Sequence, residues 1–241
     1  MVSISLVTPA YNEGESIRVF LEDAVEIIKK NKLEAEIIVV NDGSTDDTKD
    51  ICERLSKRHQ IIKLINHEIN KGYSCAVSTG IKHATKDFII LIDSDGQFDV
   101  KDIPAFLKKH NETRADVIVG HRVNRKGTFL RKLMSRGMTK TSNLLFGLKL
   151  KDTQCAFQFI KTGVLKSVDI ESPSFQAPTE IKIKLAALGY DFEQIPITHH
   201  ERRKGKTSVK AFKIIPSTIL FLLYLKLKTL VIKLRRARDY K

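Results

Sequence analysis

The chain has 241 residues, of which 42% are hydrophobic and 29% are charged. This balance excludes a chain that is disordered throughout, and the length fits one large domain with room for an appendage but not two independent enzymes. The net charge of +14 is unevenly placed, because residues 1–120 carry 16 basic and 20 acidic side chains and residues 121–241 carry 26 basic and 8 acidic ones. The second half therefore suits an anionic partner, whether nucleic acid, a negatively charged bilayer or a phosphorylated substrate.

The cysteines indicate a reducing compartment. Cys52, Cys75 and Cys155 are odd in number and lack the Cys-x-x-Cys spacing, so neither a disulfide framework nor a zinc site is expected. The sequence also enters an apolar strand pattern directly, without the basic and long apolar regions of a signal peptide. These features predict a cytoplasmic location.

Short apolar runs alternate with helical periodicity in the first half of the chain. The runs predicted to form buried strands are 3–8, 36–41, 61–65, 88–92 and 117–119. Helices are predicted at 17–28, after the capping residues 44–46, and at 100–110. Repeated strand and helix units predict an α/β fold with a parallel sheet, in which ligands bind outside the carboxyl ends of the strands.

Polar loops follow three of the predicted strands, at 8–13, 41–46 and 93–97. Asp93 and Asp95 are two residues apart after a strand, so their carboxylates point to one side. In that arrangement they suit a divalent cation that is shared with the phosphates of a substrate. The alternative is that these aspartates form a turn or a solvated cap.

Two further side chains can complete a ligand site at these loops. Gln97 can add an oxygen to a cation held by the aspartates. Asp42 ends the second predicted strand, where its carboxylate can accept hydrogen bonds from a nucleoside base or ribose. An Asx-turn is the alternative for Asp42, because the residues that follow it would also satisfy that turn.

The three loops carry a resemblance to a known family. Their motifs are Pro9-Ala10-Tyr11-Asn12-Glu13, Asn41-Asp42-Gly43-Ser44-Thr45-Asp46 and Asp93-Ser94-Asp95-Gly96-Gln97. In this order and spacing they resemble the family 2 glycosyltransferases with the GT-A fold, from residue 3 to about residue 210. The resemblance implies a Rossmann-like α/β domain over 1–210, with a mostly parallel sheet flanked by helices. The remaining segment, 211–241, is predicted to be a basic and apolar helix associated with a membrane.

Motifs in the second half narrow the resemblance. Gly120-His121-Arg122, the basic helix from Phe129, residues 152–157 and residues 202–208 are similar to those of the dolichyl-phosphate mannose and dolichyl-phosphate glucose synthases. This similarity implies a metal-dependent, inverting transfer of a hexose. The implied donor is GDP-mannose or UDP-glucose, and the implied acceptor is a polyprenyl phosphate such as dolichyl phosphate.

The resemblance also assigns site residues. The nucleotide sugar would be held by Pro9, Ala10, Tyr11, Glu13, Asp42, Asp93, Ser94, Asp95, Gln97, Arg202 and Lys206. Mg²⁺ or Mn²⁺ would be held by Asp93, Asp95 and Gln97. The catalytic residues would be Asp95, Arg122 and Arg131, with the two arginines meeting the acceptor phosphate. Taken alone, the basic stretch that contains Arg202 and Lys206 is either a mobile lid over the diphosphate or a solvated loop.

The chemistry favours an acceptor that is already an anion. A phosphate monoester, with a second pKa of about 6, is largely dianionic at neutral pH and needs positive charge rather than a general base. Transfer to a glycan or protein hydroxyl is the alternative within the family, and it would require Glu180 as base. A nucleic-acid-binding protein is the alternative from another class, but aromatic residues make up only 7% and no helix-turn-helix or zinc pattern is present.

Two segments predict contact with an anionic membrane surface. The helix from Phe129 combines apolar and basic side chains, although a helix packed on the domain has the same pattern. Residues 214–225 are uncharged and almost wholly apolar, but as a helix they span only about 18 Å against a hydrocarbon core of about 30 Å. With the basic residues that follow, this segment is predicted to lie in the cytoplasmic interface, an oligomer contact being the alternative. The sequence leaves the oligomeric state open.

Overall fold

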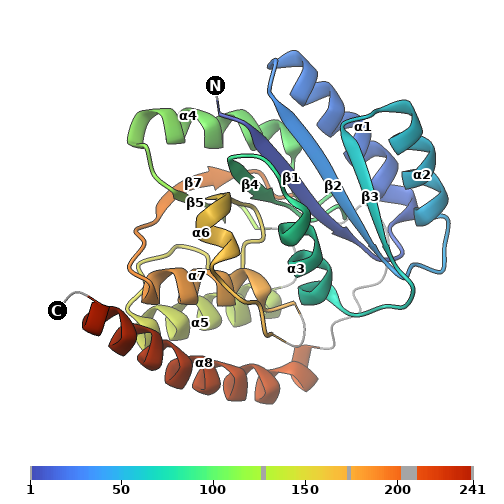
Figure 1. Cartoon of the computed structure of the whole chain (residues 1–241). Coiled ribbons are helices and arrows are strands. Elements are labelled where there is room, and N and C mark those ends of the chain that lie inside the picture. Colours follow the sequence, from blue (N-terminus) through green and yellow to red (C-terminus); the bar gives the residue numbers. More distant parts are fainter. Residues whose placement is uncertain (1, 126–128, 173–174, 202–210, 240–241) are drawn as a thin grey trace.

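The computed structural model describes residues 2–125, 129–172, 175–201 and 211–239. In this part of the chain, one sheet contains β1 Ile4–Ala10, β2 Ala35–Asp42, β3 Ile62–His67, β4 Phe88–Leu91, β5 Val117–Arg122, β6 Gln158–Lys161 and β7 Glu193–Ile197. The helices are α1 Gly14–Lys30, α2 Thr48–Arg58, α3 Tyr73–His83, the short 3₁₀ turn η1 Val100–Asp102, α4 Ile103–Thr113, α5 Phe129–Phe146, α6 Thr162–Lys166, α7 Ala177–Ala187 and α8 Ala211–Asp239. Helices cover both faces of the sheet (Figure 1), as the prediction of an α/β fold requires.

The sheet is mostly parallel, with the strand order β3-β2-β1-β4-β6-β5-β7. β1 pairs in parallel with β2 and β4, β2 with β3, and β5 with β7. β6 pairs antiparallel with both β4 and β5. The five predicted strands are confirmed, whereas the sequence pattern does not predict β6 and β7, which are only four and five residues long. The pairs in the described sheet that do not involve β6 are parallel, so the mostly parallel sheet predicted from the family resemblance is confirmed.

A core lies on each face of the sheet. Ile4 and Leu6 of β1 belong to the cluster that also contains the inner residues of α1, α2 and α4. Val7 belongs to the cluster under α3, α6 and α7. This alternation is what a strand with both faces covered requires. At Gly80 of α3, a Cβ atom would lie 2.3 Å from Cγ1 of Val7, so glycine allows α3 to pack close to the sheet.

The last helix, α8, lies along the outside of α5 and α7 (Figure 1). Leu222, Leu225 and Thr229 face the domain and are buried. A side-chain hydrogen bond also joins α8 to the start of α7, where Gln176 Nε2 donates to Thr218 Oγ1 at 2.6 Å. Within the described ranges, no helix carries an apolar stretch long enough to cross a bilayer.

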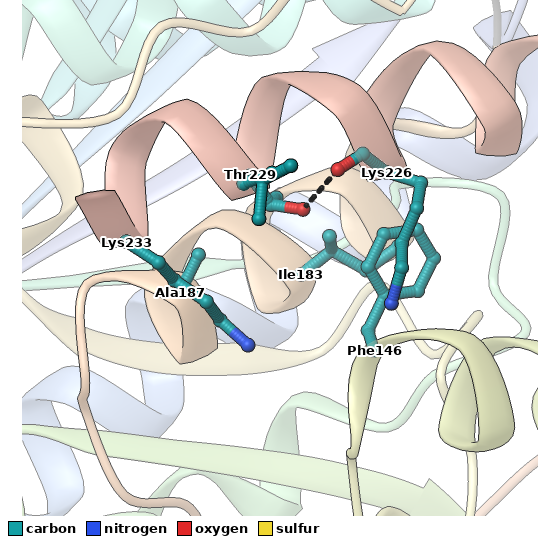
Figure 2. Close-up of a pocket in the computed structure, with 7 residues that line it drawn as sticks. Phe146, Ile183, Ala187, Lys226, Thr229 and Lys233 are labelled. Carbon is teal, nitrogen blue, oxygen red and sulfur yellow. Dashed lines mark hydrogen bonds between the residues drawn. The ribbon is translucent and has the colours of Figure 1, made fainter.

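A groove of about 350 Å³, open to solvent, separates α8 from α7 and the end of α5 (Figure 2). Its lining residues are Phe146, Ile183, Ala187, Lys226, Thr229, Leu230 and Lys233. None of them comes from the loops at the carboxyl edge of the sheet. This groove is therefore separate from the site to which the sequence motifs point.

Candidate active site

The loops that follow β1, β2 and β4 are joined to one another by hydrogen bonds. The Asn12 N–H donates to Ser44 Oγ at 3.0 Å, and the Thr45 N–H donates to Asn12 Oδ1 at 2.8 Å. Ser94 Oγ donates to the Pro9 carbonyl at 3.0 Å. Since β1 lies between β2 and β4 in the sheet, the structure brings the three predicted loops together at one edge.

The start of α1 is fixed by side chains from the loop after β2 and the first turn of α2. The Glu13 N–H donates to Thr48 Oγ1 at 2.9 Å, and the Gly14 N–H donates to Asp46 Oδ2 at 3.1 Å. The first N–H groups of a helix have no partner within the helix, so these contacts satisfy groups that would otherwise need water. They also set the position of the loop after β1.

The residues predicted to hold the nucleotide differ in how much of each side chain a ligand could reach. Tyr11 is 45% exposed and presents its ring to solvent, whereas Ala10 and Ser94 are each 2% exposed. Pro9 and Glu13 are half-buried. Ala10 and Ser94 therefore shape the loops, and Tyr11 and Glu13 are the side chains best placed to meet a ligand directly.

The carboxylate of Asp42 is used in hydrogen bonds within the protein. Its carboxylate accepts hydrogen bonds from the Lys71 N–H at 2.9 Å and the Gly72 N–H at 2.8 Å. It also lies 2.7 Å from His67 Nδ1, and the other ring nitrogen of His67 lies 3.0 Å from Thr79 Oγ1. Asp42 is only 3% exposed, so its observed role is to fix the turn that precedes α3. A contact with a nucleoside stays a prediction.

Asp93 and Asp95 form a carboxylate pair in the loop after β4. Tyr73 Oη, from the first residue of α3, donates to Asp93 Oδ1 at 2.8 Å, and the Gln97 N–H donates to Asp95 Oδ1 at 3.0 Å. Removal from water and the neighbouring carboxylate of Asp95 raise the pKa of Asp93 to about 7. A cation would relieve this repulsion, so the pair fits the metal that the motif predicts.

The carboxylate pair would need further ligands to enclose a cation. In the described part of the chain, no group of three or more His, Cys, Asp and Glu side chains is arranged to hold one. Hard divalent cations take about six oxygen ligands, so the others would come from Gln97, from water or from the phosphates of a substrate. Such a site is incomplete until a substrate is present.

A buried ion pair lies beside the carboxylates. At the end of β5, Arg122 Nε donates to Asp152 Oδ2 at 2.6 Å and Arg122 Nη2 donates to Asp152 Oδ1 at 2.9 Å. Burial by itself would raise the pKa of Asp152, but the bidentate pair with Arg122 lowers it. The charge of Arg122 also lowers the pKa of Asp93, against the larger effect of burial. The basic and acidic groups thus belong to one site.

The turn that carries Asp152 is held from α7. The Thr153 carbonyl accepts hydrogen bonds from Thr179 Oγ1 at 3.0 Å and from Lys182 Nζ at 3.1 Å. The Cys155 carbonyl accepts a second bond from Lys182 Nζ, at 2.6 Å. Sequence reasoning misses Lys182, because the alternation of isoleucine and lysine in α7 does not show which lysine is covered by another part of the chain.

Glu180 does not fit the role of general base that the alternative with a hydroxyl acceptor requires. It is fully buried, and its carboxylate accepts hydrogen bonds from the Glu171 N–H at 2.9 Å and the Ser172 N–H at 2.8 Å. It also forms an ion pair with Lys184 at 2.7 Å. Because Glu180 is committed to the fold and closed to solvent, it cannot take a proton from a hydroxyl acceptor.

Three predicted site residues cannot be placed. Arg131 lies in α5, but its side chain is outside the described part of the structure, and Arg202 and Lys206 lie outside the described residues altogether. Their assignments to the acceptor phosphate and the donor stay predictions.

Comparisons with known proteins point to one family. The model of the family described as Glycosyl transferase family 2 matches residues 5–168. Dolichyl-phosphate beta-glucosyltransferase ALG5A of Trichomonas vaginalis is 29% identical over 226 residues, which cover 86% of this chain and 69% of that protein. Dodecaprenyl-phosphate galacturonate synthase of Rhizobium johnstonii is 27% identical over 238 residues, which cover 94% of this chain and 68% of that protein.

A solved structure shows the same fold. Glucosyl-3-phosphoglycerate synthase from Mycobacterium tuberculosis, in complex with Mn²⁺ and uridine-diphosphate-glucose, aligns with a TM-score of 0.71 and 18% sequence identity. The alignment covers 93% of this chain and 79% of that one. Another structure of the same enzyme holds Mg²⁺ and uridine-diphosphate. The likeness confirms the predicted GT-A architecture, a mostly parallel sheet flanked by helices.

Proposed function

This chain belongs to glycosyl transferase family 2, and we propose that it transfers a hexose from a nucleotide sugar to a polyprenyl phosphate such as dolichyl phosphate. The observation that carries the proposal is a carboxylate pair, Asp93 and Asp95, within electrostatic reach of the buried ion pair of Arg122 and Asp152. A nucleoside diphosphate needs the first group and an anionic acceptor needs the second. The two similar proteins that act on polyprenyl phosphates support this acceptor.

On the donor side, we assign the nucleotide to the joined loops after β1, β2 and β4. Tyr11 and Glu13 present their side chains there, and the buried Asp42 fixes the turn before α3 through its hydrogen bonds. Asp93, Asp95 and Gln97 would hold Mg²⁺ or Mn²⁺, which supplies positive charge to the departing diphosphate. The mycobacterial structures with Mn²⁺ or Mg²⁺ support the use of a divalent cation.

On the acceptor side, the phosphate would displace the diphosphate in one step, which inverts the configuration of the sugar. A phosphate dianion needs no base, and the burial of Glu180 removes the base on which a hydroxyl acceptor would depend. Arg122, held in orientation by Asp152, would draw the phosphate toward the sugar. Arg131 would assist it from α5, and Arg202 and Lys206 would cover the diphosphate.

The test of this function is an incubation of the purified protein with Mn²⁺, a polyprenyl phosphate and one radiolabelled donor at a time. UDP-glucose and GDP-mannose are the two donors to compare, since the comparisons do not fix the donor. We expect one label to become extractable into organic solvent. Label that stays in water with both donors, while a glycan or protein becomes labelled, would overturn the proposal.

We also propose that α8 places the enzyme on the cytoplasmic surface of a membrane. Its exposed apolar residues are Ile219, Leu220, Leu223, Leu227, Leu230, Val231 and Leu234. At about 100° per residue they form one stripe on the side of α8 opposite its buried residues. Lys226 and Lys228 flank the stripe on its two edges, but their ammonium groups are bound within the protein, Lys226 to the Leu145 carbonyl and Lys228 to the Glu171 carboxylate. The apolar side chains therefore carry the proposed contact with the interface.

Vesicle sedimentation tests this orientation. We expect binding to vesicles that contain an anionic phospholipid, and a loss of about tenfold in Leu223→Gln/Leu227→Gln, since each substitution removes apolar surface from the stripe. Ile69→Gln is the matched control, because Ile69 is 69% exposed but lies outside α8. Equal binding by both variants would contradict the orientation.

A further inference from the structure

Lys182 is a lysine without exposed surface. It lies in the middle of α7 and its side chain is fully buried. Its ammonium group donates to two backbone carbonyls, of Thr153 at 3.1 Å and of Cys155 at 2.6 Å. Within the described residues, no carboxylate lies within ion-pair distance of it. A buried charge of this kind costs several kcal/mol, so a lysine here needs a reason beyond filling space.

The environment of Lys182 disfavours its charged form. Burial lowers the pKa of Lys182 to about 8, and the more distant charge of Asp152 offsets this only in part. The neighbouring thiol of Cys155 is neutral at that pH, because burial raises its pKa to about 11. The remaining charged neighbour, Arg122, repels the ammonium group.

The three charged groups leave a surplus. Arg122 and Lys182 are positive and Asp152 is negative, so the buried cluster carries one net positive charge. The surplus lies next to the carboxylate pair, since the charge of Arg122 reaches Asp93. When a divalent cation neutralises that carboxylate pair, an anion is needed to balance the cluster.

We propose that Lys182 is a positioning residue for the acceptor: it fixes the turn at Thr153 and Cys155, and it keeps the cluster one positive charge in excess, which the phosphate of the acceptor neutralises. This inference rests on the proposed function. It adds a residue on α7 that carries no recognisable motif, and it explains why the turn is held by an ammonium group where a neutral donor could also reach the carbonyls.

Lys184 provides an internal comparison. Lys184 lies on the same helix and is 4% exposed, and its ammonium group pairs with Glu180 at 2.7 Å and with Glu171 at 2.6 Å. Its charge is therefore neutralised within the fold, and its contacts lie on the far side of α7 from the turn. Lys184→Met should lower stability without a selective effect on the acceptor, which makes it the matched control.

The experiment compares the acceptor KM and the donor KM in the wild type, Lys182→Met, Lys182→Arg and Lys184→Met at pH 7. Lys182→Met keeps the length of the side chain and removes its charge. We expect its acceptor KM to rise about tenfold with a change of less than about twofold in the donor KM, because hydrogen bonds to charged groups contribute about that factor. Lys182→Arg keeps the charge and should recover most of the acceptor affinity.

The pH dependence separates a charge effect from a structural one. In the wild type, the acceptor KM should rise as the pH passes through about 8, because Lys182 loses its proton there. The acceptor phosphate stays dianionic over this range. Lys182→Arg stays charged, so its acceptor KM should be flat up to pH 9, and that of Lys182→Met should be high and flat.

Each outcome decides the inference. A raised acceptor KM in Lys182→Met, with rescue and a flat profile in Lys182→Arg, supports it. Transfer by the wild type with an unchanged acceptor KM in Lys182→Met, or an equal rise in Lys184→Met, overturns this inference alone. Failure of the wild type to transfer sugar to any polyprenyl phosphate overturns the proposed function and this inference with it. If Lys182→Met does not fold, the profile of Lys182→Arg against the wild type decides the matter.

Discussion

The two halves that we propose for the site, one for the donor and one for the acceptor, are organised by different forces. In the donor half, polar side chains such as Asn12, Ser44 and Ser94 are used in hydrogen bonds between neighbouring loops. In the acceptor half, Arg122 and Lys182 are buried charges that hold a turn. The donor surface therefore has its shape before a ligand binds, whereas the acceptor surface has its charge before a ligand binds.

Because of this difference, substitutions in the two halves should have different energetic effects. A neutral hydrogen bond contributes about 1 kcal/mol net, so the donor loops are fixed by many small terms. A buried ion pair costs desolvation, and the loss of one partner destabilises by about 3–5 kcal/mol. Substitutions in the donor half should therefore change donor binding in small steps, except at the metal ligands, while substitutions in the acceptor half should affect stability and acceptor use together.

The largest expected effect is at Asp95. Asp95→Ala would remove an oxygen ligand from the proposed cation beside the departing diphosphate, so transfer should fall about a thousandfold while the circular dichroism spectrum stays unchanged. Asp116→Ala is the control, because the Asp116 carboxylate lies at the surface in an ion pair with Lys161. Turnover in Asp95→Ala within about tenfold of the wild type, or transfer that survives tight metal chelation, would contradict the metal assignment.

The next effect is at the buried pair. Asp152→Ala leaves Arg122 without its bidentate partner, so the free energy of unfolding should fall by about 3 kcal/mol and the acceptor KM should rise. In Arg122→Met/Asp152→Leu no buried charge is left unpaired at these positions, and urea titration should show most of the stability restored. Acceptor affinity should remain low. A double variant with the wild-type acceptor KM would show that the pair is only structural.

A buried charge outside both halves provides a reference, because it serves stability alone: Glu36 lies at the amino end of β2, away from the loops at the carboxyl edge. Burial would raise the pKa of Glu36, but hydrogen bonds from Lys63, Ser5 and Thr85 lower it from 4.5 to about 2. A depressed pKa stabilises the fold above pH 4.5, and this stabilisation is lost as the pH falls toward 2.

Glu36→Gln should therefore lower the free energy of unfolding by about 2 kcal/mol at pH 7, and the difference from the wild type should shrink below pH 4.5. The donor KM and the acceptor KM should both stay the same. Chemical unfolding at pH 7 and at pH 3 checks the pH dependence. An equal loss at both pH values would contradict the role of the charge.

The smallest effect is at Asn12. Asn12→Ala removes the side-chain oxygen that accepts the Thr45 N–H and places alanine at a φ of 54°. The donor KM should rise about fivefold, which corresponds to about 1 kcal/mol, with the acceptor KM unchanged. A selective rise in the acceptor KM would contradict the division between the two halves.

Much of the donor half could be predicted from the sequence. Each of its loops directly follows an apolar strand, which the sequence pattern identifies. Asp93 and Asp95 are close in sequence, so their proximity does not depend on contacts between distant segments. The prediction was incomplete for Asp42 and Ser94, whose side chains turned out to bind the chain itself. Whether a polar side chain faces a ligand or a neighbouring loop depends on contacts between distant segments, which local patterns do not contain.

Less of the acceptor half could be predicted, for the same physical reason. Arg122 was assigned, but its partner Asp152 is 30 residues away and the turn that it anchors is held by Lys182 from a third segment. Glu180 and Lys182 are two residues apart in α7. No local feature of the sequence shows that Glu180 binds the backbone at Ser172 while Lys182 binds the turn at Cys155. The hydrogen bond from Tyr73 of α3 to Asp93 cannot be predicted from the sequence for the same reason.

The most direct test of the division between the halves is a calorimetric titration of UDP or GDP, in the presence of Mn²⁺, into the wild type, Asp95→Ala and Arg122→Met/Asp152→Leu. If the donor site is formed by the loops and the carboxylate pair alone, Asp95→Ala should lose the binding that depends on Mn²⁺, and the double variant should bind the nucleotide as the wild type does. Normal binding by Asp95→Ala, or a loss confined to the double variant, would contradict the account.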